Sequence, residues 1–133
     1  MKKIFILSAI VLIGYFQSKA QNILTTPLTW SVTQLTDLNT NATQSYQCTF
    51  QTNGTQTIQW VQKKLTTGLE ITSTSGTWSD VSAYGKMVFN ITADGETGSI
   101  TFEKDETGTS ITIDLSQSGQ TRLRQRYMVT NVQ

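Results

Sequence analysis

From Leu28 onward, apolar residues recur at every second position, with threonine, glutamine, serine or charged residues between them. This period of two is typical of antiparallel strands that bury one face. Glycine, asparagine and aspartate separate the runs, as expected of turns. No window shows helical periodicity, so the pattern predicts an all-β protein. The clearest runs are Tyr46-x-Cys48-x-Phe50, Met87-x-Phe89-x-Ile91 and Ile111-x-Ile113-x-Leu115.

The pattern predicts eight strands in one domain. Residues 77–79 could extend the fourth strand or form a ninth, and residues 79–85 are expected to form a loop or a helical turn. The predicted strands cover residues 28–34, 45–51, 56–63, 69–73, 86–93, 99–104, 109–116 and 120–132.

Three glycines predict the registers of three hairpins, because glycine readily takes the positive φ needed at the end of a tight loop. We expect three-residue loops that end at Gly54 and Gly119, and a four-residue loop that ends at Gly108. Inward residues then meet inward residues, which favours a sequential meander. The predicted opposite pairs are Cys48 with Ile58, Tyr46 with Trp60, Phe102 with Ile111, Ile113 with Leu123 and, on the outer face, Asp114 with Arg122.

The apolar faces of the eight strands must be covered. Closure into an up-and-down barrel covers them and removes the exposed strand edges. Two packed sheets are the other solution. We therefore predict a closed eight-stranded barrel, with a two-sheet β-sandwich as the alternative.

A family resemblance adds to this prediction. Trp30 stands near the start of the first strand, and Arg122, Arg124 and Arg126 alternate along the last one. Together with the meander of eight strands, these features resemble the lipocalin-type barrels. The resemblance implies a small apolar ligand inside the barrel, and contact between the tryptophan and an arginine at its closed end. By the alternation alone, the three arginines are expected on the outer face.

Residues 1–20 have the three parts of a secretory signal: two lysines, the apolar stretch 4–13, and small residues at the third-last and last positions, Ser18 and Ala20. The stretch is too short for a membrane-spanning helix, which needs about 20 apolar residues. Gln21 follows instead of a lipid-bearing cysteine. We predict cleavage after Ala20 and export to the periplasm or the extracellular space, without a lipid anchor or membrane span.

The predicted mature domain, residues 21–133, has seven basic and nine acidic residues, a net charge of −2. This balance offers no general attraction for nucleic acid, which binds through many contacts between phosphates and basic side chains. Its 113 residues suit one domain. Cys48 is the one thiol, so no intramolecular disulfide can form, and its place between two inward aromatics predicts burial.

The chain offers little for catalysis. It contains no histidine, and its carboxylates are expected on the outer face or at hairpin ends rather than in a shared cleft. One thiol without imidazole also argues against a transition-metal site. The sequence therefore predicts a protein that is not an enzyme and that holds no metal or cofactor.

Two hypotheses about function remain open. In the first, the barrel binds a small apolar ligand, with Trp30, Trp60 and Gln125 lining the cavity. Gln125 is expected to point inward between Leu123 and Tyr127, and a buried amide needs partners. In the second, the domain is a non-catalytic interaction module whose outer face contacts a glycan or a protein. The identity of the ligand or partner is left open.

Overall fold

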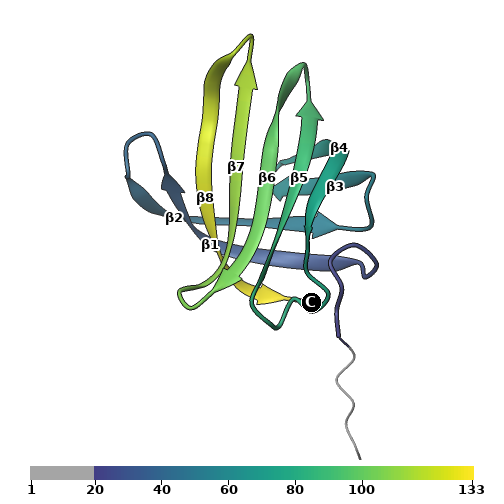
Figure 1. Cartoon of the computed structure of the whole chain (residues 1–133). Coiled ribbons are helices and arrows are strands. Elements are labelled where there is room, and N and C mark those ends of the chain that lie inside the picture. The colour runs from purple at the N-terminus through teal and green to yellow at the C-terminus, as the bar shows by residue number, and fades with distance from the viewer. Residues whose placement is uncertain (1–19) are drawn as a thin grey trace, which may run out of the picture.

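The structure is a computed structural model that describes residues 20–133; the predicted signal lies outside these residues except for Ala20. Eight antiparallel strands follow in chain order, each pairs with the next, and β8 pairs with β1 to close a barrel (Figure 1). The predicted barrel is confirmed, and the sandwich is not formed. The strands are β1 (Leu28–Asp37), β2 (Thr43–Thr52), β3 (Thr57–Gln62), β4 (Leu65–Thr77), β5 (Gly85–Ala93), β6 (Glu96–Asp105), β7 (Gly108–Gln117) and β8 (Gln120–Val132).

Strand β4 differs most from its predicted range. Its first half, Leu65 to Glu70, pairs with β3, and its second half, Glu70 to Thr77, pairs with β5. The strand is longer than predicted because its first half is paired to β3 and its second half to β5. Thr77 extends the fourth strand, as one of the two sequence readings proposed. Within residues 20–133 there is no helix with the length and apolarity needed to cross a membrane.

The barrel interior is filled by aromatic and branched side chains. The ring centroid of Phe102 lies 4.9 Å from that of Trp30 and 5.6 Å from that of Phe89. Phe50 continues the contacts to Tyr127 at 5.2 Å. All five side chains are fully buried, and such tilted and edge-to-face contacts are the favoured arrangements of aromatic rings. The core is therefore a connected aromatic cluster.

One barrel end is closed by residues outside the strands. Ile23 from the N-terminal segment and Trp78 and Val81 from the β4–β5 loop are buried. The Trp78 ring lies 5.7 Å from Trp30, and the Val81 amide donates a hydrogen bond to the Gln21 carbonyl. The N-terminal segment and the C-terminus lie at this same end in Figure 1. Two segments far apart in sequence thus seal the end together.

The predicted register of the β2–β3 hairpin is wrong. Phe50 lies opposite Trp60, so Cys48 is not opposite Ile58. The connection is a four-residue loop, 53–56, instead of the three-residue loop expected. The observed register differs from the predicted one by an even number of residues. The same side chains therefore still point inward.

The predicted register of the β7–β8 hairpin is also wrong. Ser118 and Gly119 form a two-residue turn in which both have positive φ, 52° and 78°. This conformation suits a type I′ hairpin turn. A bulge beside Leu115 then shifts the ladder by one residue. As a result Asp114 lies opposite Arg124 rather than Arg122, and Ile113 lies opposite Gln125 rather than Leu123.

Two other predictions are confirmed. Phe102 lies opposite Ile111 across β6 and β7. The three arginines of β8 are exposed on the outer face. The contact between Trp30 and an arginine implied by the lipocalin resemblance is not formed, since Trp30 packs inside against Phe102 and Trp78. The resemblance therefore holds at the level of the closed eight-stranded barrel.

Candidate functional site

The barrel wall is incomplete between β2 and β3. Backbone pairing between these strands runs from Thr49 and Val61 to Thr52 and Ile58, near the closed end. The residues of β2 that precede Thr49 do not pair with β3. Residues 43–48 thus pair with β1 on one side and with no strand on the other. A bulge at Thr33 interrupts the ladder of β1 at the same height. Bulges bend the strand that carries them, and the wall is open at the height of this one, where β2 and β3 do not pair.

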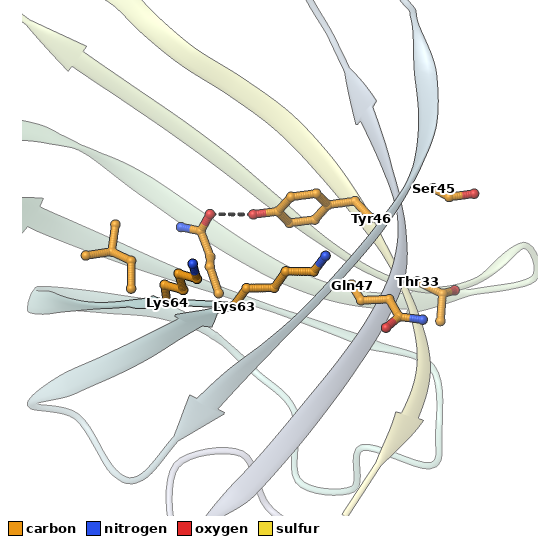
Figure 2. Close-up of a pocket in the computed structure, with 8 residues that line it drawn as sticks. Thr33, Ser45, Tyr46, Gln47, Lys63 and Lys64 are labelled. Atoms are coloured by element: carbon orange, nitrogen blue, oxygen red, sulfur yellow. Dashed lines mark hydrogen bonds between the residues drawn. The ribbon is translucent and has the colours of Figure 1, made fainter.

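A cleft of about 820 Å³ lies in this opening (Figure 2). A contiguous section of about 490 Å³ continues along the outer side of β2. We call the two together the wall cleft. The larger section has a volume typical of small-ligand sites. It is lined by Thr33, Ser45, Tyr46, Gln47, Gln62, Lys63, Lys64 and Leu65.

A side-chain bridge crosses the wall cleft. The Tyr46 hydroxyl, from β2, donates a hydrogen bond to Oε1 of Gln62 at the end of β3. Figure 2 shows the tyrosine ring pointing across the opening toward this amide. Burial raises the pKa of Tyr46 above its ordinary value, so the hydroxyl keeps its proton at neutral pH. The bridge links the two strands where backbone pairing is missing.

The floor of the smaller section is apolar and neutral. Val32 and Cys48 line it from the barrel interior, and Cys48 is 7% exposed. Burial raises the pKa of the Cys48 thiol to about 11, partly opposed by the neighbouring indole of Trp60. The thiol is therefore protonated at pH 7.

The rim of the wall cleft is cationic and partly apolar. Lys63 and Lys64, in the β3–β4 turn, line it, and neither forms an ion pair with any residue from 20 to 133. Figure 2 shows the Lys63 side chain extending toward β2. The adjacent Leu65 is 60% exposed, which is high for a leucine. The arrangement offers an apolar surface next to two positive charges.

None of the three residues predicted to bind a ligand lines the wall cleft. Trp30 is fully buried near the closed end, and its indole donates to Oγ1 of Thr52 at 3.0 Å. Trp60 and Gln125 reach Tyr127 from different strands: the Trp60 ring lies 5.8 Å from it, and Gln125 accepts a 2.5 Å hydrogen bond from its hydroxyl. Their role as ligand-binding residues stays a prediction.

Gln125 also lines a separate pocket. This pocket has a volume of about 190 Å³ and lies beside the β1–β2 turn, where Leu35 and Asp37 line it from β1. It is smaller than the usual range of small-ligand sites, about 300–1,000 Å³. The wall cleft is thus the better candidate site.

Sequence reasoning missed the residues of the wall cleft. The cleft arises where the β2–β3 ladder stops. Alternation of polar and apolar residues does not indicate where the pairing of two strands ends. One local signal was available: Lys63-Lys64 stands at the end of the predicted strand 56–63 and directly precedes the apolar Leu65. Paired lysines at a strand end indicate an exposed cationic turn.

The described residues hold no cluster of three carboxylate, thiol or imidazole side chains close enough to bind a metal. A search with models of known protein families finds none that matches the chain. Searches of curated proteins and of solved structures find no match either.

Proposed function

We propose that this chain is an exported, non-catalytic binding protein that takes a small ligand with an apolar part into the wall cleft. The observation that carries the proposal is the cleft itself, about 820 Å³ in volume, with the Tyr46 ring and the exposed Leu65 among its lining. Burial of an apolar surface against such side chains contributes about 25 cal/mol per Å².

The packing of the core supports a ligand position in the barrel wall. Phe50, Phe102 and Tyr127 are fully buried, and the Phe50 ring packs against both of the others. An eight-stranded barrel is just wide enough for its side chains to fill. A ligand is therefore expected in the wall rather than along the barrel axis, where the sequence hypothesis placed it.

The test is a titration with N-phenyl-1-naphthylamine, a neutral apolar dye that fluoresces when it leaves water. We expect saturable binding at one site. Gln47→Trp places an indole in the cleft from an exposed position on β2 and should weaken binding at least roughly tenfold, the loss of about 1.4 kcal/mol. Lys86→Trp adds the same group at an exposed position of β5 and should leave binding unchanged.

Equal binding by the wild type and Gln47→Trp would overturn the cleft as the site. No saturable binding of the dye by the folded wild type would overturn the proposal and favour the interaction module that contacts a glycan or protein. Export is tested separately: N-terminal sequencing of secreted material should begin at Gln21.

A further inference from the structure

The charge of the wall cleft is opposite to that of the domain. Residues 20–133 contain seven basic and nine acidic side chains, so the described chain is net negative. Lys63 and Lys64 nevertheless line the larger cleft section, and no aspartate or glutamate does. Positive charge beside an apolar surface attracts ligands that are both anionic and apolar.

The two lysines differ from three of the five other cations among residues 20–133; the remaining two, Lys86 and Arg126, likewise form no ion pair there but do not line the cleft. Arg122 lies 3.6 Å from Glu96, and Arg124 lies 3.6 Å from Asp114. Lys104 donates a hydrogen bond to a backbone carbonyl in the β4–β5 loop. Lys63 and Lys64 take part in no ion pair among residues 20–133. Both positive charges lie on the lining of one cleft section, so an anion bound there is attracted by both of them.

The position of each lysine indicates where the anionic group would lie. Lys63 lines both sections of the cleft, and its side chain extends toward β2 (Figure 2). Lys64 lines the larger section and not the smaller one. The cationic part is therefore the β3–β4 turn, while Tyr46 and Leu65 supply the adjacent apolar contact. We expect Lys63 to contribute more than Lys64.

We propose, on the basis of the proposed binding function, that the ligand is an amphipathic organic anion. Its carboxylate, sulfonate or phosphate group pairs with Lys63 and Lys64, and its apolar body lies against Tyr46 and Leu65. The backbone ladder is absent at this point of the wall, so the body can enter from the side without breaking strand pairing.

The experiment compares two dyes with the same ring system. 8-Anilinonaphthalene-1-sulfonate carries a sulfonate, and N-phenyl-1-naphthylamine is its neutral counterpart. We expect the wild type to bind the sulfonate more tightly. Lys63→Gln and Lys64→Gln should each weaken binding of the sulfonate roughly two- to fivefold, as for exposed ion pairs, and should weaken binding of the neutral dye by clearly less.

Three controls make the result specific. Lys86→Gln removes an exposed charge from β5, away from the cleft, and should change neither dye. Lys63→Arg combined with Lys64→Arg keeps both charges and should retain sulfonate binding. Raising the ionic strength should weaken binding of the sulfonate and not of the neutral dye, since salt screens exposed charges.

The outcomes separate this inference from the proposed function. If the neutral dye binds the cleft and the double glutamine variant binds the sulfonate as tightly as the wild type, the anionic class is wrong and the binding function stands. If the glutamine variants weaken both dyes equally, the lysines act by packing and the anionic class is again wrong. If the wild type binds neither dye, both proposals fail.

Discussion

The two sides of this barrel are built from the same alternation of residues, yet one side is sealed and the other is open. Strands β6 and β7 pair without interruption from Thr97 and Ser116 to Asp105 and Gly108. Strands β2 and β3 pair over four positions, from Thr49 and Val61 to Thr52 and Ile58. Alternation sorts side chains into inner and outer faces, whereas continuous backbone pairing closes a wall.

The difference extends to the contacts that hold each side. Between β6 and β7, inward Ile100 and Ile113 lie opposite each other and are fully buried. At the opening, a single tyrosine-to-amide hydrogen bond spans the gap, and Leu65 is exposed. We therefore expect changes in the sealed side to affect stability, and changes at the opening to affect binding.

The largest loss of stability is expected for Tyr127→Ala on β8. The ring is fully buried against Phe50, Trp60 and Tyr46. Truncation should reduce the free energy of unfolding by about 3–5 kcal/mol, as for other large buried aromatics. Urea unfolding followed by tryptophan fluorescence measures it. A cost below about 1 kcal/mol would show that the aromatic core does not hold the sealed side.

Gly98→Ala tests how closely β6 and β7 approach. A Cβ at Gly98 would lie 1.8 Å from the backbone oxygen of Asp114, so the strands must separate. We expect a cost of about 3 kcal/mol, the upper part of the range for overpacked sites. The matched control is Gly68→Ala on β4, where the nearest atom lies 3.8 Å away. This change should be neutral or stabilise by up to about 1 kcal/mol; equal losses at both positions would contradict the comparison.

The reactivity of Cys48 tests how deep the opening reaches. Burial raises its pKa from 9.0 to about 11. The thiolate, which is the reactive form, is then roughly 100-fold scarcer at pH 8 than in the unfolded chain, equivalent to about 2.7 kcal/mol. Iodoacetamide should label the native protein at least that much more slowly than the protein in urea, and the native rate should rise with pH up to about 11. Native labelling within a few-fold of the unfolded rate would mean that the cleft exposes the thiol.

The smallest effect is expected for Arg124→Ala on the outer face of the sealed side. Its guanidinium lies 3.6 Å from Asp114, and both side chains are about half exposed. Such a pair contributes no more than about 1 kcal/mol to stability, and less in high salt. Thermal unfolding at low and high ionic strength measures it. A loss as large as that of Tyr127→Ala would require this arginine to hold the β7–β8 ladder in place.

Much of the fold could be predicted from the sequence because the relevant signals are local. Strand positions and inward faces follow from alternation, which each strand carries within itself. The β6–β7 register was predicted correctly because Gly108, with φ of 122°, stands at the turn and the ladder has no bulge, although the connection is the two residues 106–107 and Gly108 itself begins β7. The β7–β8 register was missed because a bulge beside Leu115 adds a residue that no local pattern marks.

By itself the sequence determined the all-β class, the order of the strands and the side chains that point inward, since these depend on periodicity and turn chemistry. The tertiary structure alone decided that Trp78 and Ile23 seal one end, and that β2 pairs with β3 from Thr49 onward and not before it. Both depend on the tilt and closure of the whole barrel, which brings together residues far apart in the chain. The wall cleft belongs to this second kind of feature.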